Sequence, residues 1–191
     1  MITIFTNVER QYMMLRQTRE YLYDNQMMSS NMQSYFFDTS VTWSEHHAAA
    51  IKASSIIIFL WQGPVYECEV ADKALKWLRN QDKIAYAFMS TAESSKDTVS
   101  GFTAEEIKQI RDYILCSGSS NYQALVLWLA NKSGQETCEY KLPQELVWQG
   151  IYHPRAKDKV LLSTGKYLSE FCPHKRPLVG ILFSRESWIW Q

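Results

Sequence analysis

The chain lacks an excess of charge of either sign. Lys and Arg together number 20, as do Asp and Glu, so no net field favours binding to nucleic acid or to an anionic membrane. It also lacks an apolar run near the ~18 residues that a membrane span needs. Residues 1–5 lack the basic start of a signal peptide. These absences predict a cytoplasmic protein with no membrane span and no nucleic-acid partner.

Paired cysteines are lacking as well. The four cysteines are scattered, with no C-x-x-C spacing, at Cys68, Cys116, Cys138 and Cys172. Such spacing is ordinary among reduced thiols and argues against a disulfide framework. Aromatic residues, by contrast, are plentiful: the seven Trp and eleven Tyr are interpreted mainly as packing groups.

Motifs for nucleotides and metals are incomplete. No G-x-G-x-x-G follows the first apolar segment, and residues 164–166 (TGK) resemble the end of a P-loop whose upstream glycine is missing. His46 and His47 are adjacent, and neighbouring positions on a helix face about 100° apart, which favours a solvated pair. Residues 172–174 (CPH) offer no second pair of zinc ligands. We therefore expect no cofactor and no metal site in this segment.

The most informative stretch is the apolar run at residues 56–61, IIIFLW. It is short, rich in β-branched and aromatic residues, and bounded by Ser54-Ser55 and by Gln62-Gly63-Pro64. This composition favours a strand over a helix. Because no polar residue alternates with the apolar ones, both faces must be covered, which is typical of a central parallel strand.

Strands and helices are predicted to alternate over the first half of the chain. The strands are expected at residues 1–8, 32–38, 56–61 and 83–90, and the helices at 9–24, 40–54 and 66–80. This order predicts an α/β fold, an open and mainly parallel, Rossmann-like sheet with helices on both faces. Residues 91–100, rich in Ser, Asp and Lys, are predicted to form a solvated loop.

Two helices in a row then break the alternation. Thr103 and Glu106 form a capping box at the start of the first, whose predicted buried stripe is Ile107, Ile110, Ile114 and Leu115. The second is predicted at residues 121–131. We expect a helical appendage, or a pair packed over the sheet edge. The predicted domains are a sheet domain at 1–100, the helical appendage at 101–147, and a linker with the first strand of a following domain at 148–191.

The C-terminal part carries another apolar strand, residues 178–183. No covering helix follows it before Gln191, so we expect the start of a second α/β unit and the N-terminal part of a longer protein. Ligand sites in open α/β sheets lie beyond the carboxyl ends of strands, where Arg185 is placed. His153 precedes a proline in an extended stretch. The alternatives are a surface turn residue for His153 and a simple ion pair for Arg185.

Several segments together resemble one family. Residues 150–154 (GIYHP) precede residues 176–185 (RPLVGILFSR), a pairing similar to that in the large subunit of cobaltochelatase, CobN, and the H subunit of magnesium chelatase. Residues 57–63 resemble the family's early strand, and residues 121–129 its N-x-x-N-x-L-x-x-L helix. Ser184 stands where the family commonly has Tyr, and Ala124 replaces the second Asn.

The resemblance implies a function and a site. It implies the N-terminal domain of a cobaltochelatase-like large subunit, a ligase that inserts a metal, cobalt here, into a tetrapyrrole for cobalamin biosynthesis. Separate AAA+ motor subunits would hydrolyse ATP, and the fragment would serve as a scaffold or docking domain. His153, Arg185 and Trp188, with Trp190, are candidates for contacting the tetrapyrrole, and none is expected to be catalytic. The full-length family implies a divalent metal ion and ATP used by its partners.

Two other interpretations remain open on the sequence. One is a stand-alone α/β interaction module, and the other is a relative that acts on magnesium porphyrin or haem, including metal removal instead of insertion.

Overall fold

The chain folds as two compact units, Met1–Gln144 and Glu145–Gln191. The computed structural model describes residues 1–37, 42–63, 69–81, 84–90, 98–134 and 136–145, with the backbone of 151–152 and 160–161. In the second unit, β6 (Ile151–Tyr152) and β7 (Val160–Leu161) pair antiparallel.

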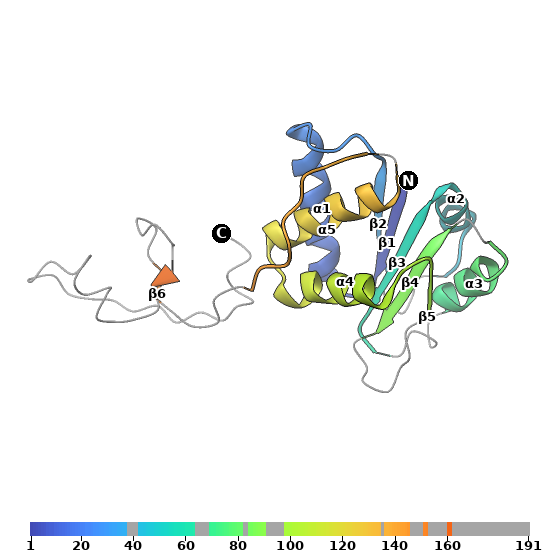
Figure 1. Ribbon diagram of the computed structural model, residues 1–191. Coiled ribbons are helices and arrows are strands. Elements are labelled where there is room, and N and C mark those ends of the chain that lie inside the picture. Colours follow the sequence, from blue (N-terminus) through green and yellow to red (C-terminus); the bar gives the residue numbers. More distant parts are fainter. Residues whose placement is uncertain are drawn as a thin grey trace, which may run out of the picture. The chain divides into compact units, whose positions relative to one another are not determined.

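The first unit is built on a five-stranded sheet of order β2-β1-β3-β4-β5 (Figure 1). Its strands are β1 (Ile2–Thr6), β2 (Met32–Phe36), β3 (Ile56–Trp61), β4 (Ala85–Ser90) and β5 (Thr98–Ser100). The first four run parallel, and β5 pairs antiparallel with β4. The predicted α/β class, with an open and mainly parallel sheet, is therefore confirmed.

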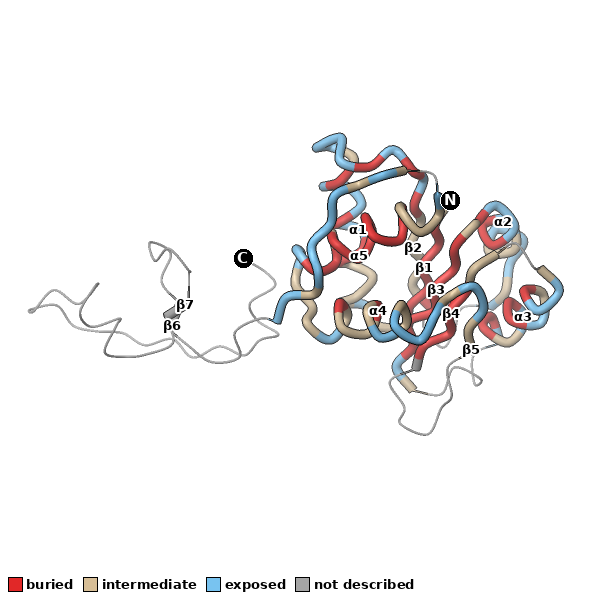
Figure 2. The backbone as a smooth tube through the Cα atoms, viewed as in Figure 1, coloured by how far each residue is buried: buried red, intermediate tan, exposed pale blue. Residues whose placement is uncertain are grey.

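Strand β3 occupies the centre that its composition predicted. It pairs with β1 on one side and β4 on the other, in the register Phe5↔Phe59↔Phe88. All six of its side chains are buried, as are all five of β1, and both strands are red in Figure 2. An unbroken apolar run is stable only where both faces of the sheet are covered.

Strand β5 corrects one expectation. Residues 98–100 belong to the stretch predicted as a solvated loop, yet they extend the sheet as a short edge strand. Gly101 follows it with φ +75°, and a Cβ atom there would lie 2.8 Å from the Ala85 Cβ. Glycine is therefore required both for the backbone angle and for the close approach of the chain to β4.

The helices cover both faces of the sheet. Right-handed crossovers place α1 (Glu9–Asp24), which links β1 to β2, on one face. The chain then crosses in the other direction, so α2 (Glu45–Ala53) and α3 (Glu69–Leu78) lie on the opposite face (Figure 1). No helix in the described part of the chain is long and apolar enough to cross a membrane.

Helices α4 (Ala104–Cys116) and α5 (Ser119–Lys132) complete the unit. The predicted capping box is present: the Thr103 hydroxyl accepts from the Glu106 N–H at 3.2 Å, and the Glu106 carboxylate accepts from the Thr103 N–H at 2.8 Å. Of the predicted stripe, Ile110 is buried and Ile107 and Ile114 are partly buried, but the prediction was wrong at Leu115, which is 71% exposed; Tyr113 is fully buried instead. Helix α5 packs against α1 and α4 and is buried over nearly its whole length.

Candidate functional site

The residues predicted to contact a tetrapyrrole, His153, Arg185 and Trp188, lie outside the described residues, as does Trp190. The same holds for residues 176–185, the second half of the motif pair. Of residues 150–154, the structure describes the backbone of 151–152 as β6. The described part of the chain positions other polar and aromatic groups at its sheet edge and between its helices.

The carboxyl ends of β1 and β3 mark the switch point of the sheet, where the chain leaves adjacent strands toward opposite faces. Ligands commonly bind in the crevice at such a point. Here the Asn7 side chain bridges it: Nδ2 donates to the Gln62 carbonyl at 2.9 Å, and Oδ1 accepts from the Gln62 N–H at 2.7 Å. The Asn7 amide pairs with the Gln62 backbone as a neighbouring strand would, and it joins the loop after β1 to the loop after β3.

The same edge carries a second polar connection. The Thr6 hydroxyl donates to Gln11 Oε1 at 2.8 Å and accepts from the Val8 N–H at 3.1 Å. It thereby orients the first turn of α1, whose N-cap residue Val8 makes no side-chain cap bond. The Thr6, Asn7 and Gln11 side chains are uncharged, and each is hydrogen-bonded within the protein. Their role at this edge of the sheet is therefore mainly structural.

A second amide bridge lies at the start of α5. The buried Asn121 side chain donates through Nδ2 to the carbonyl of Ser117 at 2.7 Å and to that of Gln144 at 2.8 Å. Its Oδ1 accepts from the Gln144 N–H at 2.9 Å. Asn121 is the first Asn of the helix motif noted in the sequence. It ties the end of α4, the start of α5 and residue 144 together.

Residues 136–145, here called the strap, run back along α5 without forming a helix or strand. Asn131 makes another amide bridge: Nδ2 donates to the Cys138 carbonyl at 2.7 Å, and Oδ1 accepts from its N–H at 2.5 Å. Between the two bridges the Tyr113 hydroxyl donates to the Lys141 carbonyl at 2.6 Å. The strap thus carries the chain to the boundary of the first unit along a defined path.

Glu136 secures the other end of the strap. Its Oε1 accepts from the Ser29 N–H at 2.9 Å and from the Ser29 hydroxyl at 2.7 Å, while the Cys138 thiol donates to Oε2 at 3.3 Å. Burial raises the pKa of Cys138 to about 11, and the hydrogen bond and charge of Glu136 add to the effect. At neutral pH the thiol is therefore a protonated donor and a poor nucleophile.

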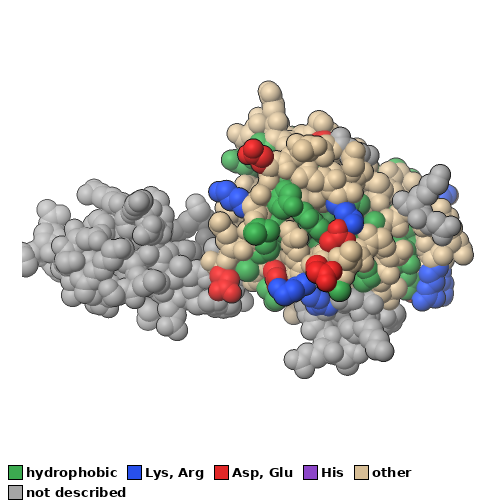
Figure 3. Space-filling view, in the orientation of Figure 1, with side chains coloured by type: hydrophobic (Ala, Val, Ile, Leu, Met, Phe, Trp, Pro, Cys, Tyr) green, Lys and Arg blue, Asp and Glu red, His purple; other side chains and the backbone are tan. Residues whose placement is uncertain are grey.

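An ion pair joins the beginning of α4 to the end of α5. Lys132 Nζ lies 2.6 Å from Glu106 Oε1 and 5.4 Å from the centre of the Phe102 ring. Burial alone would raise the pKa of Glu106, but the hydrogen bond from Lys132, the Thr103 N–H and the Lys132 charge together lower it. On the surface of α4, Lys108 and Asp112 pair at 2.5 Å, and Figure 3 shows acidic and basic side chains side by side there.

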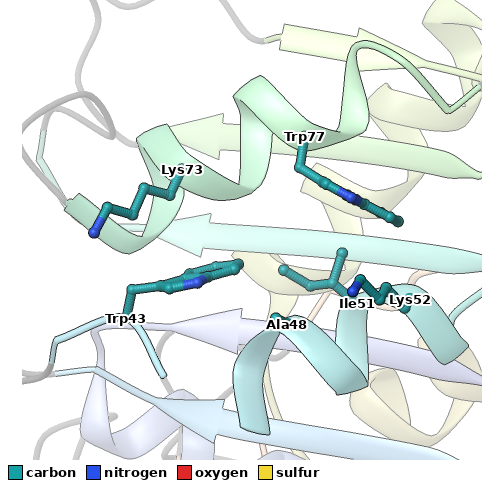
Figure 4. A pocket seen from close by; sticks show the side chains of 6 residues that line it. All are labelled: Trp43, Ala48, Ile51, Lys52, Lys73 and Trp77. Atoms are coloured by element: carbon teal, nitrogen blue, oxygen red, sulfur yellow. The ribbon is translucent and has the colours of Figure 1, made fainter. Parts of the chain in front are cut away.

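A hollow of about 300 Å³ lies between α2 and α3 (Figure 4). Apolar groups form most of it and two ammonium groups border it; the lining residues are Trp43, Ala48, Ile51, Lys52, Lys73 and Trp77. The α2 residues share one helix face, at positions i, i+3 and i+4, and the α3 residues stand at i and i+4. Trp43 comes from the segment just before α2.

The histidine pair lies on the same side of the sheet. His46 is exposed, and His47 takes part in the cap of α2, where its Nδ1 accepts from the Ser44 N–H at 3.2 Å. Burial, and then the charge of His46, lower the pKa of His47. Among the described residues, no three His, Cys, Asp or Glu side chains gather as metal ligands would.

The comparisons with known proteins bear on the strap and the residues after it. The family CobN/Magnesium Chelatase matches residues 111–191. The resemblance is confirmed. The matched range contains α5, Asn121, the strap and both halves of the motif pair, whereas residues 57–63 lie outside it.

Two individual similarities accompany the family match. The uncharacterized protein MJ0908 of Methanocaldococcus jannaschii is 35% identical over 78 residues, which are 40% of this chain and 6% of that protein. The catalytic subunit of cobaltochelatase from Mycobacterium tuberculosis has a similar fold, with a TM-score of 0.56, 10% sequence identity and 80% of this chain covered. The chain spans 12% of that subunit, so both relatives are many times longer.

Sequence reasoning missed the hollow and the strap. Trp43 and Trp77 are far apart in the sequence, and only the crossover from β2 to β3 and onward to α3 brings them to one place. The strap has no hydrophobic period. The one available signal was Asn121, which the family motif singled out without its structural reason.

Proposed function

We propose that the chain contributes the N-terminal scaffold of a chelatase-type large subunit, which inserts cobalt into a tetrapyrrole. The ATP that drives insertion is hydrolysed by separate AAA+ motor subunits. In this proposal His153, Arg185 and Trp188 contact the tetrapyrrole, with Arg185 on its carboxylate or amide fringe. The first unit, residues 1–144, is the scaffold that precedes these residues in the chain.

One observation carries the proposal: the family match spans residues 111–191. That range begins within α4 and includes the strap, so the family's sequence pattern continues from the described scaffold into residues 145–191. The similar fold of the cobaltochelatase subunit supports the α/β architecture of the scaffold. Cobalt, the motor subunits and the docking role come from the family resemblance.

The chemistry of the candidate residues suits such a substrate. A tetrapyrrole is flat and apolar with a polar fringe, so an aromatic wall such as Trp188 and a guanidinium such as Arg185 are complementary to it. A guanidinium binds a carboxylate through two parallel N–H···O bonds, which a lysine cannot reproduce.

The test is an absorbance titration of a metal-free corrin and of protoporphyrin IX with the 191-residue chain. We expect a saturable shift of the visible bands that Arg185→Lys and Trp188→Leu weaken. Arg16→Lys is the matched control, because Arg16 pairs with Glu20 on the surface of α1. Equal binding by all three variants, or no binding of either ring, would refute the assigned contacts.

The role in metal insertion needs the complete subunit. With the AAA+ motor subunits present, cobalt insertion that depends on ATP and is lost when residues 1–144 are deleted supports the scaffold role. Magnesium insertion under the same conditions would favour the magnesium-porphyrin alternative. No insertion of either metal, with the chain active only in protein binding, would favour a stand-alone interaction module.

A further inference from the structure

The hollow between α2 and α3 has aromatic walls. Figure 4 shows the Trp43 and Trp77 side chains extending from different elements into the space between the two helices. Both indoles pack against the core with part of their surface and stay partly exposed. Indole rings form favourable offset-stacked or edge-to-face contacts with another aromatic ring. Their arrangement favours a planar ligand.

The charged groups at the hollow are of one sign. Lys73 lies toward the Trp43 end and Lys52 toward the Trp77 end (Figure 4), and none of the lining residues is acidic. Lys73 pairs with Glu69 at 2.5 Å, with both side chains about half exposed. Among the described residues, no carboxylate lies within ion-pair distance of Lys52. The ammonium group of Lys52 is therefore available for an anion.

We propose that this hollow binds a small planar aromatic carboxylate. The ring lies against the Trp43 and Trp77 indoles, the carboxylate pairs with Lys52, and Lys73 adds positive potential. A volume of about 300 Å³ stands at the lower end of the range of roughly 300–1,000 Å³ for small-molecule pockets. It admits one or two fused rings and is too small for a whole tetrapyrrole, so the inference is independent of the proposed function.

The first experiment compares two probes with the same ring system and different charge. 2-Naphthoate and its neutral counterpart, 2-naphthalenemethanol, are titrated into the 191-residue chain, and binding is followed by isothermal calorimetry and tryptophan fluorescence. We expect one site for 2-naphthoate and binding of the neutral probe weaker by about tenfold, the usual size of a charge-assisted hydrogen bond. Equal binding of the two probes, or no binding at millimolar concentration, would overturn the proposal.

The second experiment separates the hollow from the general surface charge. Lys52→Gln should weaken 2-naphthoate binding about five- to tenfold, and Lys73→Gln, whose ammonium is shared with Glu69, about twofold. Lys76→Gln is the matched control, because Lys76 also stands on α3 and pairs with an acidic residue four positions earlier, Asp72, at 2.7 Å, outside the hollow. A loss at Lys76 equal to that at Lys52 would mean non-specific attraction and would contradict the site.

The aromatic walls are tested with two variants of one position. Trp77→Phe keeps a ring, so binding should fall about threefold, whereas Trp77→Leu should reduce the fluorescence response to the part due to Trp43 and weaken binding about tenfold or more. Far-UV circular dichroism and a thermal melt establish that each variant is folded. If Trp77→Leu unfolds, Trp77→Phe still tests the site. Unchanged 2-naphthoate binding in both Trp77→Phe and Lys52→Gln would refute the proposal.

Discussion

Replacing Asn121 by Ala should weaken the unit at the junction of α4, α5 and the strap. The side chain is 3% exposed and makes three hydrogen bonds, to Ser117 O, Gln144 O and Gln144 N. Alanine removes all three and leaves backbone groups without partners. Each bond contributes about 1 kcal/mol net, and a buried group left unpaired costs about 1–3 kcal/mol.

The loss of stability in Asn121→Ala depends on how exposed the hydrogen-bond partners of Asn121 are. Gln144 is exposed and Ser117 is partly exposed, so water can reach part of the freed backbone. The unpaired groups then cost less than they would in the core, and the three lost bonds dominate. We expect Asn121→Ala to lower the free energy of unfolding by about 2–4 kcal/mol, measured by urea denaturation followed by circular dichroism.

Asn121→Asp distinguishes the bridge from simple packing. Aspartate has nearly the shape of asparagine and keeps the acceptor for the Gln144 N–H, but its second oxygen faces the carbonyls of Ser117 and Gln144. At neutral pH the Asp variant should therefore be less stable than the Ala variant. Repulsion raises the pKa of the new carboxyl, so the Asp variant should regain stability relative to wild type as pH falls toward about 4.

Asn25→Ala is the control for losing an asparagine. Asn25 is exposed, and its Nδ2 makes one bond, to the Tyr21 carbonyl at 2.8 Å, so its loss should cost no more than about 0.5 kcal/mol. If Asn121→Ala costs as little as Asn25→Ala, or if Asn121→Asp matches wild type at pH 7, the bridge does not stabilise the junction.

Glu106, Gly101 and the absence of a phosphate-binding motif in the sequence each carry a further prediction. The pKa of Glu106 is lowered in the folded protein, so its carboxylate stabilises the fold at pH values above its ordinary pKa, and this contribution is lost as pH falls below about 4.5. Glu106→Gln should flatten that part of a curve of unfolding free energy against pH, and an unchanged curve would contradict this. Gly101→Ala should destabilise the β4–β5 edge by about 1–3 kcal/mol in urea denaturation, because its φ is +75° and its Cβ would lie 2.8 Å from the Ala85 Cβ; wild-type stability would refute the steric argument. The isolated chain should hydrolyse no ATP in a phosphate-release assay, since no phosphate-cradling loop is present in its sequence; turnover by a pure preparation would contradict this.

The parts of the fold that the sequence predicted well depend on short-range signals. The run at residues 56–61 is apolar on both faces, so its central place follows from burial alone. The capping box of Thr103 and Glu106 needs only two side chains three positions apart. The alternating order of strands and helices then restricts the sheet to few possible strand orders, because crossover connections are right-handed.

The parts that escaped prediction depend on contacts between distant residues. β5 has three residues and no hydrophobic run of its own, and it exists because β4 offers an unpaired edge. Leu115 is 71% exposed while Tyr113 on the same helix is fully buried, so an apolar residue near the helical period is no evidence of burial. The hollow requires α2 and α3 to be placed before Trp43 and Trp77 can be seen together.

Amide bridges explain how a segment with no regular structure keeps a defined course. Backbone N–H and C=O groups must find partners wherever they leave a helix or sheet. Asn121 and Asn131 each supply one donor and one acceptor to a single strap residue, as a neighbouring strand would. Ala124, which stands where the family commonly has a second Asn, is 5% exposed and packs as a core residue. Asn131, about two turns further along α5, makes the second bridge, so the strap is held near both of its ends.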